Sequence, residues 1–268
     1  MRLNKYLAKS GVASRRKSDE LIKMATTTVN NEIVLDPAYE VNEIDEIRYD
    51  GKLLKIDKNK VVIMFNKPVD VITSVNDPFN RKTVMNYINY KKRVVPIGRL
   101  DKDSTGLLLL TNDGDLARQL ELPSTAWIRR YRVRVYGRPQ EKQLEKLSKG
   151  VTLDGIKYGT LDVKLDKQGP SNAWLTIGLR EGKNREVRRL MESIELKVMR
   201  LIRISFGPFQ LGNLEAGQIE EVKPTSLKEQ LGIFSNKPGN FAKAQQRKSS
   251  IQKTRNKTKN ADYSGIKS

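Results

Sequence analysis

Apolar residues near the N-terminus recur at helical intervals. The first such group predicts a short amphipathic helix and comprises Leu3, Tyr6, Leu7 and Val12. Ser14 is a suitable N-cap for a second helix that runs to about Met24. Leu21 and Ile22 would face the interior from this second helix. The first stretch of the chain is therefore expected to contain two short helices.

The pattern then changes to that of strands. A strand with a hairpin-like turn is expected through residues 29–31 and on to 50–51. Residues 61–65 form a continuous apolar run, which is typical of a buried strand, and the sequence at 66–68 predicts a turn that ends it.

A strict alternation of arginine and apolar residues follows at 130–135. This period of two predicts a half-buried strand with Arg130, Arg132 and Arg134 on one face and Tyr131 on the other. Arginines two residues apart on a strand are separated by about 6.6–6.8 Å, which is close to the spacing of successive phosphates. We therefore expect Arg130 and Arg132 to contact nucleic acid.

The next elements are a strand at 174–179 and a turn at 181–184. A helix is predicted after them, because apolar residues fall at i, i+3, i+4 and i+7 in Val187, Leu190, Met191 and Ile194. Away from this apolar stripe we expect Arg185, Arg188, Arg189 and Glu192. Strands with a few interspersed helices, without regular βαβ spacing, indicate an α+β fold.

Charge and composition suggest a polyanionic partner. The 268 residues include 51 Lys and Arg against 31 Asp and Glu, a net charge of +20. The chain divides on charge and pattern into domains at 1–60 and 61–235 and a basic tail at 236–268, which we expect to be disordered because it has few apolar residues. The longest aliphatic run, 107–110, is too short to cross a membrane, and no signal peptide is evident, so we expect a cytoplasmic protein.

Whole reaction classes are excluded because the chain has no cysteine and no histidine. Disulfides, thiolate nucleophiles, Cys/His zinc sites and Ser-His-Asp catalysis all require one of these residues. Any catalysis must rely on carboxylates, Lys, Arg, Tyr, Ser or Thr, or on a metal bound by carboxylates.

Three consecutive basic residues, Arg15, Arg16 and Lys17, occupy the first turn of the second predicted helix. The helix macrodipole disfavours cations there by a few tenths to ~1 kcal/mol. A phosphate ligand would explain why the sequence accepts this cost, and the alternative is a solvated charged face.

The segment from Gly98 to Gly114 holds the best candidate for chemistry. Two glycines, Gly98 and Gly106, bracket a polar loop that leads into four leucines. The loop carries Asp101 and Asp103, either of which suits a carboxylate at the wall of a cleft. The alternative is that an aspartate here bonds to its own backbone in an Asx-turn. The pattern alone does not choose between the two aspartates.

This segment resembles the active-site signature of the RsuA-type rRNA pseudouridine synthases. The match is Gly-Arg-Leu-Asp-x-x-Ser-x-Gly-Leu-Leu-Leu-Leu-Thr-Asn-Asp-Gly at 98–114. Three further stretches agree in order and spacing, at 65–74, 181–189 and 201–214. Residues 2–56 are similar to the S4 RNA-binding module of the same family. The resemblance covers about residues 2–225.

The resemblance implies a role for three residues. Asp101 would be the nucleophile, Tyr131 would lie in the pocket for the base, and Arg188, with Arg189 as the alternative, would be the basic partner of the aspartate. The implied fold is a small S4-type domain followed by a mixed, mainly antiparallel sheet with flanking helices. The implied reaction needs no cofactor and no metal.

The implied partner is ribosomal RNA, bound by a monomer. The region around 122–124 and 129–131 resembles the large-subunit branch of the family more than the small-subunit branch. Two departures from the family pattern stand out. Asp70 replaces a glycine after the Lys-Pro turn, and Thr26, Thr27 and Asn31 replace the usual composition of the S4 hairpin.

Two other functions compete with this one. A non-catalytic RNA-binding or ribosome-assembly protein would use the S4-like module and the basic tail, but would leave the 98–114 segment unexplained. A nucleic-acid glycosidase or nuclease needs a second catalytic carboxylate or a cluster of carboxylates, and the motif offers only Asp103 near Asp101.

Deletion of residues 236–268 is expected to weaken RNA binding and to flatten its salt dependence. The segment carries nine basic residues and one acidic residue, and each phosphate that the shortened protein leaves unneutralised lowers the slope of log K against log salt by about 0.7–0.9. Affinity measured across a salt series tests this, and an unchanged slope would refute a role for the tail.

Overall fold

The computed structural model describes residues 1–125 and 127–231. Two compact units divide the chain, residues 1–222 and 223–268, and helix α6 (Pro224–Leu231) is the described part of the second. The basic tail predicted at 236–268 lies outside the described residues. The domain boundaries predicted at 60 and 235 stay predictions.

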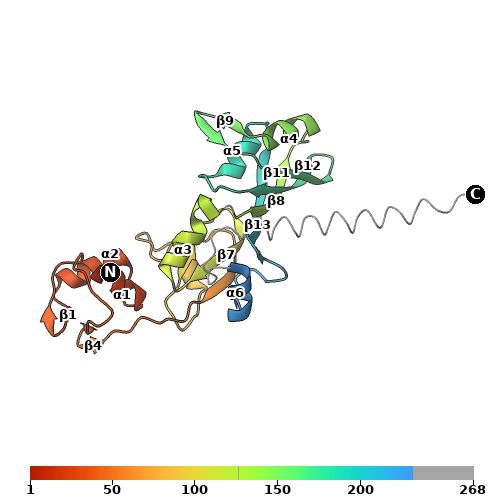
Figure 1. Cartoon of the computed structure of the whole chain (residues 1–268). Coiled ribbons are helices and arrows are strands. Elements are labelled where there is room, and N and C mark those ends of the chain that lie inside the picture. Colours follow the sequence, from red (N-terminus) through yellow and green to blue (C-terminus); the bar gives the residue numbers. More distant parts are fainter. Residues whose placement is uncertain (126, 232–268) are drawn as a thin grey trace, which may run out of the picture. The chain divides into compact units, whose positions relative to one another are not determined.

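The N-terminal part contains the two predicted helices, α1 (Leu3–Lys9) and α2 (Arg15–Lys23), which pack against each other (Figure 1). The side chain of Ser14 accepts a hydrogen bond from the backbone N–H of Lys17, which confirms the predicted N-cap. A small core forms from Leu3, Leu7, Ile22, Val29, Val41 and Ile47.

A four-stranded sheet completes this part in the order β2-β1-β3-β4. Its strands are β1 (Thr27–Val29), β2 (Glu32–Ile33), β3 (Ile47–Tyr49) and β4 (Lys52–Leu53). The predicted hairpin turn is confirmed at residues 30–31, between β1 and β2, and a second hairpin turn at residues 50–51 joins β3 and β4. Asn30 and Asn31 have φ values of 53° and 69°, and Asn tolerates this left-handed conformation better than most residues. Asn31 therefore makes the turn in place of a glycine.

The larger sheet has nine strands within the described residues, in the order β11-β12-β8-β13-β7-β5-β15, with β14 paired to β13 and β6 paired to β7. Its members are β5 (Val62–Lys67), β6 (Val95–Ile97), β7 (Thr105–Thr111), β8 (Arg129–Tyr136), β11 (Asp162–Gln168), β12 (Asn172–Leu179), β13 (Lys197–Phe206), β14 (Phe209–Gln210) and β15 (Ile219–Glu221). Among these described strands only β13 and β7 pair in parallel. The sheet is thus mixed and mainly antiparallel, as the resemblance implied.

Smaller elements flank this sheet. They are α3 (Gly114–Glu121), α4 (Glu141–Ser148), α5 (Glu186–Glu192), the hairpin of β9 (Val151–Leu153) and β10 (Ile156–Tyr158), and 3-10 turns at Val84–Asn86 and Pro123–Thr125. None of the helices in the described ranges has the length and apolar character needed to cross a membrane.

Strand β8 confirms the predicted alternation. Tyr131, Val133 and Val135 are buried, while Arg132 and Arg134 are exposed. The buried face packs on a core to which α4 and α5 contribute Leu144, Leu147, Val187, Leu190 and Met191. Helix α4 contacts β11 and helix α5 contacts β13 (Figure 1). Residues of the 71–94 segment join the same core beside β5 and β7. The side of the sheet that packs on this core, which includes Tyr131, is called the covered face below.

Two expectations for single elements are wrong. Strand β5 does not end before residue 66 but runs through Lys67, since the pairing with β7 continues from Val62 to Lys67. Helix α5 ends at Glu192, before Ile194. Arg188 was expected away from the apolar stripe of this helix, yet it is buried.

Gly106 allows β7 and β13 to meet. It has φ of 102° and is paired with Arg203. A Cβ at this position would collide with the backbone carbonyl of Arg203 and lie 2.7 Å from the Arg203 nitrogen. Only glycine combines this backbone conformation with so close an approach.

Gly106→Ala is expected to lower the free energy of unfolding by ~3 kcal/mol or more, because both the left-handed φ and the clash with backbone atoms oppose the new methyl group. Gly114→Ala is the matched control. Gly114 begins α3 and a Cβ there meets nothing within 4 Å, so this change should be neutral or stabilise by up to about 1 kcal/mol. Urea denaturation of both variants tests the pair, and equal effects would contradict the proposed steric cause.

Candidate active site

The loop between β6 and β7 presents Asp101, and its backbone is clamped from one side by Thr73. The Thr73 hydroxyl donates to the carbonyl of Leu100 at 2.7 Å and accepts from the Leu100 N–H at 3.2 Å. Within the loop, the N–H of Ser104 donates to the carbonyl of Asp101 at 3.1 Å. The carboxylate itself stays accessible, with 37% of the side chain exposed.

Lys67 holds the backbone of the same loop through hydrogen bonds. Its side chain is fully buried, and Nζ donates to the carbonyls of Ser104 at 2.8 Å, Pro68 at 2.9 Å and Lys102 at 3.4 Å. Burial lowers the pKa of Lys67 to about 8, and the carboxylates of Asp103 and Asp101 oppose this shift. The ammonium therefore fixes the loop through its backbone and leaves the Asp101 side chain accessible.

The sequence interpretation did not single out Lys67. It treated the Asn-Lys-Pro sequence as a turn, and a lysine is seldom fully buried. The available signal was its position at the end of a continuous apolar strand, directly before a proline.

Two arginines at the start of α5 reach the loop. Arg185 Nη1 lies 3.8 Å from Asp101 Oδ2 and 3.4 Å from Asp103 Oδ2. Arg188 Nη2 lies 3.0 Å from Asp103 Oδ2 and donates to the Asp103 carbonyl at 3.1 Å. The expected pair of Arg188 with Asp101 is replaced by a pair of Arg188 with Asp103. Arg189, the alternative, is exposed and makes no ion pair in the described part of the chain.

The sheet register brings Tyr131 to the same face as this cluster. Lys67 pairs with Gly106, Gly106 with Arg203, and Arg203 with Tyr131, across β5, β7, β13 and β8. Directly paired residues point to the same side of a sheet, so Lys67 and Tyr131 both lie on the covered face. Tyr131 is buried.

Arg203 lies between these two residues in the same row. It is buried, and its Nε donates to the carbonyl of Leu107 at 2.6 Å. Its Nη2 has no hydrogen-bond partner among residues 1–125 and 127–231. A buried guanidinium nitrogen without a partner is available to an acceptor on a ligand.

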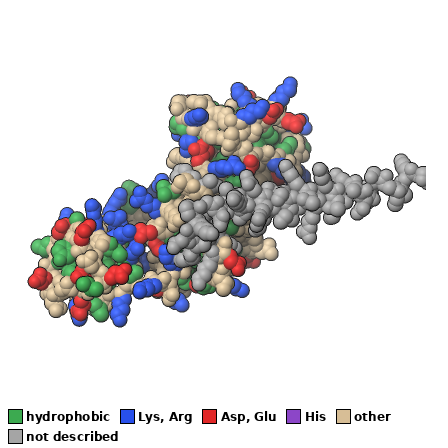
Figure 2. All heavy atoms as spheres, viewed as in Figure 1, with side chains coloured by type: hydrophobic (Ala, Val, Ile, Leu, Met, Phe, Trp, Pro, Cys, Tyr) green, Lys and Arg blue, Asp and Glu red, His purple; other side chains and the backbone are tan. Residues whose placement is uncertain are grey.

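The other predicted RNA-binding residues lie elsewhere. Arg130 and Arg132 point to the sheet face opposite Tyr131, and the Arg132 guanidinium lies 4.8 Å from the centre of the Trp174 ring. In α2, Arg15, Arg16 and Lys17 are exposed. Lys17 pairs with Glu20 at 2.7 Å. Lys and Arg side chains are spread widely over the face drawn in Figure 2.

The turn between β12 and α5 positions the two arginines. Glu186, in the first turn of α5, is buried and accepts from the backbone N–H of Lys183 at 2.9 Å. Glu181 pairs with the Lys183 ammonium at 2.5 Å and accepts from the N–H of Gly159 at 2.8 Å. Burial, together with the nearby Glu181 carboxylate, raises the pKa of Glu186 to about 7.

The first residues of the loop, Gly98 and Arg99, border a cavity of about 210 Å³. It is lined by Thr73, Ser74, Val75, Pro96, Gly98, Arg99 and Glu121. No group of three or more Asp and Glu side chains in residues 1–125 and 127–231 is arranged to hold a metal ion. The chemical groups that converge near this loop are two carboxylates, two guanidinium groups and a buried ammonium.

Two family models match the chain. One, described as RNA pseudouridylate synthase, matches residues 61–193, and an S4 domain model matches residues 1–47. The chain is 41% identical to an uncharacterized RNA pseudouridine synthase of Rickettsia prowazekii, over 86% of this chain and 97% of the relative. It is 37% identical to ribosomal large subunit pseudouridine synthase B of Bacillus subtilis, over 85% of this chain and 94% of the relative.

A solved structure described as a pseudouridylate synthase is also similar. It superposes with a TM-score of 0.60 at 26% sequence identity, over 86% of this chain and 99% of that chain. The similarity therefore extends to the fold of both the N-terminal part and the larger sheet.

Glu186→Gln is expected to remove a pH-dependent loss of stability. Between about pH 4.5 and 7 the folded protein keeps a proton on Glu186 that the unfolded chain has released, so the free energy of unfolding falls as pH rises through this window. Glutamine keeps the acceptor for the Lys183 N–H and carries no charge. At pH 8 the variant should be more stable than wild type by up to about 3 kcal/mol, and near pH 4 the two should be equal. Denaturation midpoints across this pH range test the difference, and parallel curves would contradict it.

Proposed function

The chain belongs to the RNA pseudouridine synthase family and is an enzyme of that kind, and we propose that it converts a uridine of large-subunit ribosomal RNA to pseudouridine with Asp101 as the nucleophile. The observation that carries this proposal is the accessible Asp101 carboxylate on a loop held by Thr73 and Lys67. The relative named for the large ribosomal subunit supports the choice of RNA.

The difference between the two aspartates favours Asp101. Asp103 is held by Arg188 at 3.0 Å and by Arg185 at 3.4 Å. Asp101 has a single, longer contact, 3.8 Å from Arg185. A carboxylate that is free of close ion pairs is the better nucleophile, and a guanidinium nearby still favours its ionised form.

The reaction rearranges one base on its ribose. The N1–C1′ bond breaks, the uracil rotates, and C5 bonds to C1′, after which the proton on C5 is released. Asp101 would form the covalent bond that holds the intermediate, at a carbon of the sugar or of the pyrimidine, and this bond breaks again to release the pseudouridine and the free carboxylate. The uridine must leave its stack to reach the loop, and Tyr131 is an aromatic surface on which the extruded base can stack.

Arg185 takes the place that the sequence interpretation gave to Arg188. It is the basic group closest to Asp101, whereas Arg188 holds the neighbouring Asp103 and the loop backbone. We therefore propose that Arg185 stabilises the negative charge of Asp101 and that Arg188 holds the loop in position. We further propose that the protein acts on RNA as a monomer in the cytoplasm.

Asp101→Asn is expected to abolish turnover and leave RNA binding close to wild type, because the amide keeps the shape of the side chain and loses its nucleophilicity. The assay is tritium release from a large-subunit rRNA transcript labelled at uridine C5, with binding measured on the same RNA.

Asp103→Asn is the matched control. It changes a carboxylate two residues away that lies between the same arginines, and should lower kcat by about tenfold or less. Equal loss in both variants would contradict the assignment of Asp101. If wild-type protein binds the transcript without releasing tritium, large-subunit rRNA is not its substrate and that part of the proposal fails.

A further inference from the structure

A rigid loop at residues 75–83 carries the most exposed aromatic side chain among the described residues. Phe79 is 75% exposed at the tip of this loop. An exposed aromatic ring normally costs solvation free energy, and in RNA-binding proteins such rings serve as stacking surfaces for bases.

The loop is held in shape by one buried carboxylate. Only 5% of the Asp77 side chain is exposed. It accepts hydrogen bonds from the backbone N–H groups of Phe79 and Arg81 at 3.2 and 2.9 Å, and from the Arg81 guanidinium at 2.6 and 3.1 Å. The position of Phe79 is therefore fixed by the fold, which lowers the entropy cost of binding to it.

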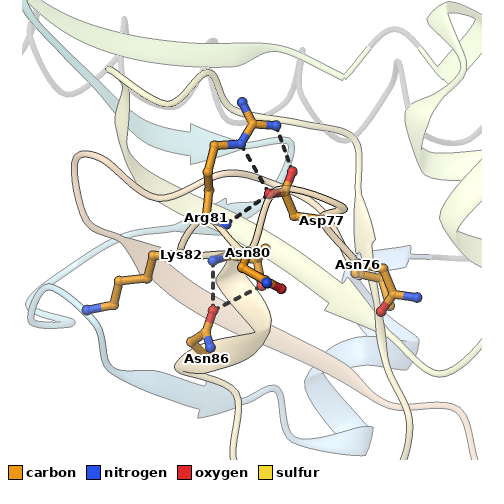
Figure 3. A pocket seen from close by; sticks show the side chains of 8 residues that line it. Asn76, Asp77, Asn80, Arg81, Lys82 and Asn86 are labelled. Atoms are coloured by element: carbon orange, nitrogen blue, oxygen red, sulfur yellow. Dashed lines mark hydrogen bonds and ion pairs between the residues drawn. The ribbon is translucent and has the colours of Figure 1, made fainter.

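A polar cavity of about 540 Å³ opens beside this tip (Figure 3). Its lining includes Asn76, Asn80, Arg81, Lys82 and Asn86. Figure 3 shows Arg81 paired with Asp77 at one part of the cavity. The Arg81 guanidinium also lies 5.1 Å from the centre of the Phe79 ring, so it connects the cavity with the aromatic surface.

The chemistry of this surface suits a nucleotide. Side-chain amides hydrogen-bond to base edges, cations attract phosphates, and an aromatic ring with a guanidinium beside it stacks on a base. The volume is also in the range of sites that hold a small organic group.

The residues that flank the 75–83 loop connect it to the Asp101 loop. Residue 72 pairs with Thr83 in a parallel bridge, and its N–H donates to the carbonyl of Lys82 at 3.0 Å. The next residue, Thr73, holds Leu100 beside Asp101. The cavity of 210 Å³ that Gly98 and Arg99 line and the cavity of 540 Å³ share Val75 in their lining.

We propose that the 75–83 loop is a subsite for an RNA nucleotide that flanks the target uridine, with its base stacked on Phe79 and its polar groups bound in the adjoining cavity. This inference rests on the proposed function and adds a second contact to the RNA, at a fixed position relative to Asp101. The subsite contributes to the choice of RNA sequence and takes no part in the bond changes at the uridine.

The test compares Phe79→Ala with Phe79→Trp in the tritium-release assay on the large-subunit rRNA transcript. Phe79→Ala should raise KM by about tenfold, since base–aromatic stacking is removed, and keep kcat within about twofold of wild type. Phe79→Trp should restore KM, because tryptophan also stacks. Ile156→Ala is the control for removal of an exposed apolar side chain, since Ile156 is 37% exposed on β10, and its KM should equal that of wild type.

Several results would overturn the subsite. An unchanged KM in Phe79→Ala, with normal turnover by wild type, removes the subsite and leaves the proposed function intact. A loss of kcat and of thermal stability that Phe79→Trp does not restore makes Phe79 structural. If Phe79→Ala raises KM on assembled ribosomal particles but not on the free transcript, Phe79 contacts a ribosomal protein and the RNA subsite is wrong. Failure of wild type to release tritium removes both proposals together.

Discussion

The ammonium group of Lys67 is the interaction on which the position of the Asp101 loop depends. A fully buried cation is costly, and this cost is visible in the lowered pKa of Lys67, about 8. Three backbone carbonyls, one directly after Lys67 and two in the loop, offset it by accepting hydrogen bonds. Because these bonds go to the backbone, the loop is fixed and the Asp101 carboxylate keeps its freedom to react.

The second constraint is the close approach of β7 and β13 at Gly106. This contact places Arg203 opposite Gly106 and Tyr131 opposite Arg203. The strand that carries Tyr131 is thereby fixed relative to the strand that follows the Asp101 loop. A side chain on residue 106 would collide with the backbone of Arg203, so the missing Cβ is what lets these two strands pair.

Local patterns in the sequence predicted what depends on neighbouring residues. The Ser14 cap and the alternation around Tyr131 were both predicted from spacing alone, because capping and amphipathicity are local properties. Lys67 and the partners of Arg188 were not predicted. A buried lysine contradicts the usual preference for the surface, and the Arg188–Asp103 pair joins residues 85 positions apart. Such pairings are decided by how strands and helices pack.

The positions of Tyr131 and Arg132 on opposite faces of the sheet limit which RNA could contact both residues. Tyr131 lies on the covered face and Arg132 on the opposite one, and a sheet separates groups on its two faces. A short single-stranded RNA with one base stacked on Tyr131 cannot contact Arg132 on the other side of the sheet. Both residues contact the same molecule only if the RNA is folded and presents a second segment around the sheet. If Tyr131 holds the target base as we propose, any electrostatic contribution of Arg132 is separate from the recognition of that base.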